Sequence, residues 1–138
     1  MVYLIMRVFN YSFTFGTHKG IEFVDLTERI KSVVGGSSIN IGIVCVYGLH
    51  TTGAIIINEY DENLLEDIRN LIEEIVPSKK NYEHVNAPSH LISCLFDPSK
   101  VIPINDGKLG LGTYQRIIWV EVERLPRTRT VHLTIIGE

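Results

Sequence analysis

The sequence predicts a single α+β domain in which mixed or antiparallel β-sheets pack with about three helices. Its 138 residues fit one domain, because a domain usually holds about 100 to 150 residues, and a hydrophobic content of 45% is enough for a sizeable core. Apolar residues recur at helical spacing in one long segment and at alternate positions in others. No repeat or linker interrupts the pattern, so the domain is expected to span residues 1–138, with residues 1–12 as an N-terminal strand extension.

The N-terminal part reads as a strand, a turn and a short helix. Aromatic and branched residues dominate residues 2–15 and alternate with hydroxyls toward the end of this range, as in a half-buried strand. A turn is expected over residues 16–20. Asp25 and Glu28 have the spacing of a capping box, and a helix is predicted from there to Gly35-Gly36.

Two strands and the longest helix follow. Ile39–Tyr47 is almost continuously apolar, which predicts a strand covered on both faces, and Ala54–Ile57 is the next strand. The long helix is predicted over Glu59–Val76, with Asn58 as its cap, acidic residues in its first turn and Pro77 beyond its end. Its apolar stripe consists of Leu64, Leu65, Ile68, Leu71, Ile72 and Ile75.

The C-terminal half is expected to contain one more helix and three more strands. Pro88 suits the first turn of a helix that Asp97-Pro98 closes, and Asn105-Asp106-Gly107 is a hairpin turn signal. The strands are predicted over Val101–Ile104, Arg116–Val122 and Thr130–Ile136, the last with Val131, Leu133 and Ile135 alternating against polar residues.

Charge and cysteine content argue against several classes of protein. A formal net charge of -3 does not suit a general nucleic-acid binder. Cys45 and Cys94 stand in no metal-binding or disulfide spacing, which favours a reducing, cytoplasmic setting. Residues 2–6 lack the flanks of a secretion signal, and no apolar run reaches the about 18 residues of a membrane helix. We therefore expect a soluble cytoplasmic protein without nucleic-acid or membrane partners.

Three polar clusters along the chain predict one composite site. His50-Thr51-Thr52 precedes the strand at 54–57, and Asn58-Glu59 follows it. His84 and His90 flank the start of the third helix, and the glycine-rich segment 109–115 comes later. Because functional side chains gather on loops held by a rigid scaffold, we expect these clusters to meet in one pocket.

Three histidines are candidate metal ligands. His50, His84 and His90 would hold a zinc-like ion with an open position for water or substrate. The sequence contains no helical histidine pair with the usual metal-binding spacing, and partly buried, hydrogen-bonded imidazoles explain the same residues. His18 and His132 are interpreted as exposed residues outside the site.

The residues around the strand at 54–57 also have two readings. Glu59 is a candidate catalytic acid or base, but a glutamate in the first turn of a helix stabilises that helix without any chemistry. Thr51 and Thr52 would orient a substrate, or they would satisfy backbone groups at a strand end.

The glycine-rich segment is a candidate phosphate site. Gly110, Gly112 and Thr113 would let the backbone approach a phosphate, with Lys108, Arg127 and Arg129 as nearby cations. The segment lacks the ending of a P-loop, and turn geometry explains its glycines as well. Gln115 needs hydrogen-bond partners if it points inward. Arg116 and Glu121 would also fit a solvated face.

Together these residues resemble the YjbQ-like family, whose members are often named secondary thiamine-phosphate synthases. The resemblance covers about residues 13–137. Two features depart from the family pattern: the segment between His84 and His90 is shorter than in many relatives, and Tyr114 stands where relatives carry a tryptophan. The resemblance rests on His50-Thr51-Thr52, Asn58-Glu59, Asp67, Tyr82, His84, His90, Ile102-Pro103, the run from Gly107 to Gln115, and Arg127.

The resemblance implies a compact α+β homotrimer with a site for a small phosphorylated metabolite. The implied reaction is a transfer that joins a hydroxymethylpyrimidine diphosphate to a thiazole phosphate with loss of diphosphate. His50 and Glu59 would be catalytic, and His50, His84 and His90 would lie at a metal pocket. The residues expected to bind substrate or phosphate are Thr51, Thr52, Asn58, Gly110, Gly112, Thr113, Gln115 and Arg127.

The donor types leave the cofactor and the reaction open. Histidines suit a zinc-like ion, whereas the magnesium that accompanies a diphosphate prefers oxygen ligands. The chain is also far shorter than the about 250 residues of a TIM barrel, so the transferase activity would use another scaffold. Two alternatives remain: a metal-assisted hydrolase with a metal-activated water, and a trimeric protein that binds a metabolite or metal without turnover.

Overall fold

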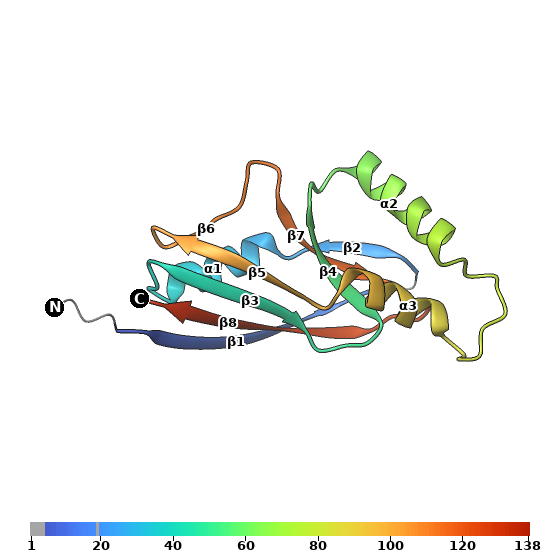
Figure 1. The fold of residues 1–138 in the computed structure, drawn as a ribbon, viewed down its shortest axis with the longest axis horizontal. Coiled ribbons are helices and arrows are strands. Elements are labelled where there is room, and N and C mark those ends of the chain that lie inside the picture. Colours follow the sequence, from blue (N-terminus) through green and yellow to red (C-terminus); the bar gives the residue numbers. More distant parts are fainter. Residues whose placement is uncertain (1–4, 19) are drawn as a thin grey trace.

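The computed structural model describes residues 5–18 and 20–138, and it confirms the α+β class. In the described part, three helices accompany two antiparallel sheets (Figure 1). One sheet has the strand order β1-β8-β3-β5-β6, and the other has the order β2-β7-β4. The strands are β1 (Arg7–Gly16), β2 (Glu22–Asp25), β3 (Gly42–Gly48), β4 (Gly53–Asn58), β5 (Ser99–Asn105), β6 (Lys108–Leu109), β7 (Arg116–Glu121) and β8 (Thr128–Gly137), and the helices are α1 (Thr27–Gly36), α2 (Glu62–Ile75) and α3 (Ala87–Phe96).

The predicted strands are present, but several of their ends differ; β3, for example, begins at Gly42 rather than at Ile39. The N-terminal strand begins at Arg7, and residues 2–4 of the prediction lie outside the described residues. Strand β2 was not predicted, because its four residues are too few for a clear alternation; it forms by pairing with β7. The hairpin predicted at Asn105-Asp106-Gly107 is confirmed, with positive φ at Asp106 and Gly107.

The long helix begins three residues later than predicted. Asn58 is the last residue of β4, where its side-chain oxygen accepts a hydrogen bond from the Glu59 backbone, so the prediction that it caps the helix is wrong. The cap is Asp61, whose carboxylate accepts the Leu64 N–H at 3.0 Å. Among the described residues, no helix is both long enough and apolar enough to cross a membrane.

The capping box predicted for the first helix does not form. Helix α1 begins at Thr27, and the Asp25 carboxylate accepts the Thr27 backbone N–H. Asp25 and Glu28 both receive hydrogen bonds from Arg116, at 2.8 and 3.1 Å. Asp25 and Glu28, which were predicted to cap the helix, therefore bind Arg116 of β7 instead.

Two apolar cores flank the three-stranded sheet. On one side, Ile55, Ile117 and Trp119 pack with α1 and with the inward side chains of the five-stranded sheet. On the other side, Ala54, Ile118 and other apolar residues pack against α2 and α3. The alternation along β4 and β7 thus divides their side chains between the two cores.

None of the described elements of one chain covers the face of the five-stranded sheet that points away from the cores. The prediction that β3 is covered on both faces is therefore wrong: Val44 and Val46 are buried, while Ile43 and Tyr47 are each 44% exposed. We call this surface the outer face. Its cross-strand rows are Ser99, Tyr47, His132 and Ser12; Val101, Cys45, Thr134 and Asn10; and Pro103, Ile43, Ile136 and Val8.

Trp119 fills the space between the two sheets and leaves no room for side chains on two glycines. A Cβ atom at Gly53 would lie 2.1 Å from Cζ2 of Trp119, and one at Gly48 would lie 2.6 Å from Cζ3. These glycines end β3 and begin β4, so the indole packs against both ends of the connection that carries His50.

We expect Gly53→Ala to lower the free energy of unfolding by about 3 kcal/mol, because the methyl group must displace the rigid indole. The matched control is Gly35→Ala in α1, where a Cβ meets no atom within 4 Å and alanine is favoured by about 0.5 to 1 kcal/mol. Urea denaturation measures both changes, and equal stabilities of the two variants would contradict the packing described.

Candidate functional site

His50 lies in the connection between β3 and β4 and is held there by Thr130 of β8. The Thr130 backbone N–H donates to Nε2 of His50 at 2.7 Å, and the Leu49 N–H donates to the Thr130 carbonyl at 3.2 Å. The imidazole also packs edge-on against Trp119, with 5.9 Å between ring centroids. Because Nε2 accepts a hydrogen bond, the neutral ring carries its proton on Nδ1.

The surroundings of His50 favour the neutral imidazole. Burial lowers its pKa from the usual 6.5, the positive charge of Arg129 lowers it further, and the negative charge of Glu121 opposes both effects only in part. At neutral pH the side chain is therefore an uncharged hydrogen-bond donor.

A buried ion pair lies beside His50. Glu121 of β7 is fully buried and Arg129 of β8 is 3% exposed. Nε of Arg129 donates to the Glu121 carboxylate at 2.5 Å, and Nη2 donates to the other carboxylate oxygen and to the carbonyl and hydroxyl oxygens of Thr52. The Thr17 hydroxyl donates to Glu121 at 2.7 Å. The pair thus joins the two sheets and fixes the end of the His50 connection.

Hydrogen bonds outweigh burial in setting the charge of Glu121. Burial by itself would raise the pKa of this carboxyl, but hydrogen bonds from Arg129, Thr17 and the Glu123 backbone, together with the Arg129 charge, hold the pKa below its ordinary value of 4.5. Glu121 is therefore ionised at neutral pH and balances the charge of Arg129.

The sequence prediction missed this pair, although the chain contains a signal for it. Glu121 was assigned to a possible solvated face, and Arg129 was considered only as a cation near the glycine-rich segment. Arg129 alternates in phase with Val131 and Leu133, and Glu121 alternates in phase with Trp119. Opposite charges at inward positions of two strands predict a buried ion pair.

Two adjoining depressions meet at His50, and we call them together the His50 hollow. The first, of about 450 Å³, is formed by the connection from Tyr47 to Thr52 with Arg129. The second, of about 390 Å³, lies between the same connection and α3 and is lined by His90, Ser93, Cys94 and Asp97 among others. Tyr47, His50 and Thr51 line both.

The structure brings the three predicted metal ligands into one region without forming a metal-ligand cluster. His50 and His90 line the same depression, and the His84 ring packs edge-on against His90 with 4.9 Å between centroids. The lone pair of the neutral His50 ring is already used by Thr130. Within the described residues, no three His, Cys, Asp or Glu side chains are placed to hold one ion. A zinc-like ion at His84 and His90 stays a prediction.

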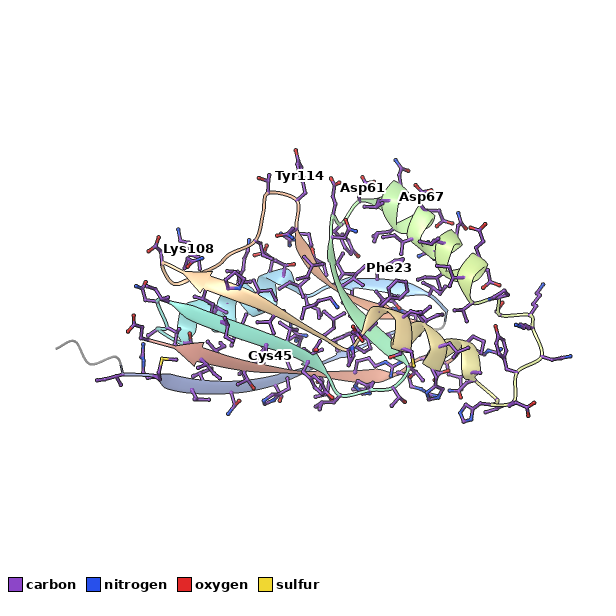
Figure 2. All side chains as sticks on the ribbon, viewed as in Figure 1. Phe23, Cys45, Asp61, Asp67, Lys108 and Tyr114 are labelled. Atoms are coloured by element: carbon purple, nitrogen blue, oxygen red, sulfur yellow. The ribbon has the colours of Figure 1, made fainter. Side chains whose placement is uncertain are left out.

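Thr51 and Thr52 lie with His50 in the hollow, whereas Asn58, Glu59 and the glycine-rich segment lie at the opposite end of β4. The six residues of β4 separate Thr52 from Glu59, which places their backbones about 23 Å apart at about 3.3 Å per residue. Asn58 pairs in register with Arg116, which directly follows the glycine-rich segment. Figure 2 shows Tyr114 of this segment and Asp61 both at the top of the view. Within one chain the predicted composite site is therefore divided in two.

Local contacts account for the glycine-rich segment. The Gln115 side-chain oxygen accepts a hydrogen bond from the Gly112 N–H at 2.8 Å. The side chain of Gln115 therefore finds its partner within the glycine-rich segment. A Cβ at Gly110 would lie 2.9 Å from Pro103. These contacts give Gly110, Gly112 and Gln115 structural roles next to exposed Thr113.

Arg127 and Lys108 also lie outside the His50 hollow. Nη2 of Arg127 is 3.8 Å from the Glu123 carboxylate, and the backbone carbonyl of Arg127 accepts a hydrogen bond from the Thr17 N–H. Lys108 lines a different depression with Lys31, beside α1. Arg129 is the basic side chain that the structure places at the hollow.

Comparisons with known proteins agree on one family. The family model described as UPF0047 protein YjbQ-like matches residues 11–138. A UPF0047 protein of Archaeoglobus fulgidus is 43% identical over 122 residues, which cover 86% of this chain and 94% of the relative. A crystal structure of a YbjQ-like protein of unknown function from Sulfolobus solfataricus P2 has a TM-score of 0.94 at 32% identity, over 97% of this chain and 100% of that one. The crystal structure of a hypothetical protein from Aeropyrum pernix K1 has a TM-score of 0.88 at 36% identity, over 94% of this chain and 98% of that one.

We expect the stability of the protein to fall as the pH drops below about 4.5. The lowered pKa of Glu121 stabilises the fold above the pKa of an unfolded glutamate, about 4.3, and this contribution is lost as the pH falls through the lower folded pKa. Glu121→Gln should lower the free energy of unfolding by about 3 to 5 kcal/mol at pH 7, because Arg129 is left buried and unpaired. The variant should also lose less stability than the wild type as the pH falls below about 4.5. Urea unfolding at several pH values tests this, with exposed Glu66→Gln as control. An unchanged slope in Glu121→Gln would contradict the assignment.

NMR spectroscopy of the imidazoles tests the state of His50. We expect long-range proton–nitrogen correlations to place the proton of His50 on Nδ1 at pH 7, because the Thr130 N–H donates to Nε2. The pKa should lie below 6.5, because burial and the Arg129 charge lower it. A proton on Nε2 at pH 7 would show that the contact with Thr130 is absent.

Proposed function

The chain belongs to the YjbQ-like UPF0047 family, and from this membership and the geometry we propose a small-molecule enzyme that acts on a phosphorylated substrate in the His50 hollow. The observation that carries the proposal is the contact between Nε2 of His50 and the Thr130 N–H, which leaves Nδ1–H as the donor of a neutral imidazole. A positioned neutral donor is suited to an oxygen atom on which negative charge develops.

The contact with Thr130 restricts the chemistry that His50 performs. With Nε2 engaged, the ring has no free lone pair and does not act as a general base unless the contact breaks. Nδ1–H instead donates to a phosphate or diphosphate oxygen, and the exposed Thr51 hydroxyl is a second donor in the hollow. Glu121 balances the charge of Arg129, so directed hydrogen bonds hold the anion more than net charge does.

The transferase reaction implied by the family naming gives this donor a role. In that reaction a thiazole nitrogen bonds to the methylene carbon of the pyrimidine, and the carbon–oxygen bond to diphosphate breaks. The diphosphate leaves with the bonding electrons, so its oxygen gains negative charge in the transition state. A hydrogen bond from Nδ1 of His50 to that oxygen strengthens as the charge grows, which is the condition for catalysis.

Magnesium is the cofactor that suits such a leaving group. A diphosphate commonly brings a magnesium ion that takes one or two carboxylates and several waters. Asp97 lines the His50 hollow, and its carboxylate would hold that ion, which would neutralise leaving-group charge.

The protein is proposed to assemble as a homotrimer, as the family resemblance implies. The outer face supports an assembly of this kind, because apolar side chains remain exposed there in one chain. Val8 is 63% exposed, Val101 58% and Ile43 44%. A sheet face that stays apolar toward water is typical of a protein interface.

We expect His50→Gln to lower kcat/KM for thiamine phosphate formation by about 100-fold to 1,000-fold, the loss measured when one transition-state donor is removed, because the glutamine amide does not place an N–H at the position of Nδ1. Glutamine keeps an oxygen that can accept the Thr130 N–H, so the connection should stay folded. The assay mixes the pyrimidine diphosphate and the thiazole phosphate with magnesium and detects the product as fluorescent thiochrome.

Two control variants locate the site. His18→Gln, at an exposed histidine outside the hollow, should keep wild-type kinetics. Glu59→Gln should also do so if the site lies within one chain, because Glu59 is at the far end of β4. Absence of product from the wild type would remove the transferase assignment, and unchanged kinetics in His50→Gln would remove His50 from the mechanism.

A further inference from the structure

We propose that a cavity between α2, α3 and the end of β7 binds a small apolar molecule that carries an ammonium group. The cavity has a volume of about 220 Å³, and we call it the Glu123 cavity. Ser89 and Ile92 of α3 line it, whereas the neighbouring His90 and Ser93 line the His50 hollow. The two sites therefore lie on different sides of α3, and binding in the Glu123 cavity is independent of the reaction proposed for the hollow.

Apolar side chains form a large part of the wall of the Glu123 cavity. Most of them belong to the core that joins the three-stranded sheet to α2 and α3. The volume is smaller than the about 300 to 1,000 Å³ of sites for drug-sized ligands. A ligand that fits must therefore be small and must have an apolar body. The apolar residues of the wall are Ile21, Val76, Pro88, Ile92 and Val122.

Glu123 places a buried carboxylate in this wall. The residue is 5% exposed. Its Oε1 accepts the Arg124 backbone N–H at 3.0 Å, and its Oε2 accepts Nδ2 of Asn86 at 3.3 Å, so each oxygen keeps a free lone pair. Among the described residues, no cationic side chain donates a hydrogen bond to this carboxylate, and Nη2 of Arg127 is 3.8 Å away. Because a buried charge is costly without a close partner of opposite sign, the carboxylate favours a cationic ligand.

The hydroxyl groups of the cavity have already used their protons. Ser89, which is 2% exposed, donates to the Val122 carbonyl at 2.8 Å. Ser78 donates to the Glu73 carboxylate, also at 2.8 Å. A hydroxyl that has donated its one proton presents only lone pairs to other groups. Both serines therefore face a ligand as acceptors, as do the carboxylates of Glu73 and Glu123.

These acceptors match a ligand that donates hydrogen bonds. An ammonium group has three donors and no acceptor, and its charge is opposite to that of the carboxylates. A phosphate or carboxylate ligand would be repelled by Glu73 and Glu123. Arg124 is the one basic residue among the described lining residues, and it is exposed, so water and salt screen its charge more than that of buried Glu123.

The apolar wall and the acceptors together define the ligand class as a primary amine with a short, branched hydrocarbon body. Such an amine keeps its proton at pH 7, as the lysine side chain does. Isoamylamine is a suitable probe. Isoamyl alcohol is its matched control, because it has nearly the same shape but no charge.

Titration of the native protein with each probe at pH 7 in matched salt, followed by proton–nitrogen NMR spectra, measures binding. We expect isoamylamine to cause saturable shifts at the backbone amides of Ile21, Ile92 and Val122, which line the cavity. Isoamyl alcohol should bind about tenfold more weakly or less, because hydrogen bonds between charged groups are stronger than those of a neutral hydroxyl.

Glu123→Gln removes the charge but keeps an oxygen that can accept the Arg124 N–H. It should weaken isoamylamine binding about tenfold and leave isoamyl alcohol binding unchanged. Glu74→Gln is the matched control, because Glu74 is an exposed residue of α2 that does not line the cavity. Ser89→Ala, which removes one acceptor, is a second variant in case Glu123→Gln fails to fold, and it should also weaken amine binding.

Equal affinity for the amine and the alcohol would overturn the inference, because the cavity would then select for shape alone. Unchanged amine binding in a folded Glu123→Gln, or amine-induced shifts that do not saturate or that map elsewhere, would overturn it as well. The titrations need no turnover, so a failed transferase assay does not affect their result.

Discussion

The buried pair of Glu121 and Arg129 is the interaction on which the rest of this architecture depends. One partner comes from each sheet, and both charges are removed from water. Their desolvation is tolerated because the carboxylate accepts hydrogen bonds from Arg129, Thr17 and the backbone that follows it. The same guanidinium holds Thr52, so the pair also sets where the His50 connection lies.

This arrangement gives His50 a defined chemical character. A histidine beside a buried carboxylate would ordinarily gain a proton more easily, but burial and the Arg129 charge dominate here. The Thr130 N–H then fixes which nitrogen carries the single proton. The result is a neutral imidazole that keeps one N–H donor, while its lone pair is occupied by the Thr130 N–H.

The outer face and the site are linked by the alternation of β3. Val44 and Val46 point into the core, which forces Ile43, Cys45 and Tyr47 to the opposite face. Tyr47 is the last of these, directly before the connection that bears His50. The outer face therefore ends at the rim of the His50 hollow.

The sequence by itself determined the α+β class, the apolar stripe of α2, the hairpin at Asn105-Asp106-Gly107 and the inward alternation of β8, because propensity and periodicity act over a few neighbouring residues. It also located His50 and His90, which line one hollow. Pairing between distant strands decided the remainder. It placed Glu59 and the glycine-rich segment at the far end of β4, turned Asp25 and Glu28 toward Arg116, and joined Glu121 to Arg129. Strand order and register are long-range properties, so the local pattern indicated which residues were polar candidates, and only the tertiary structure decided which of them meet.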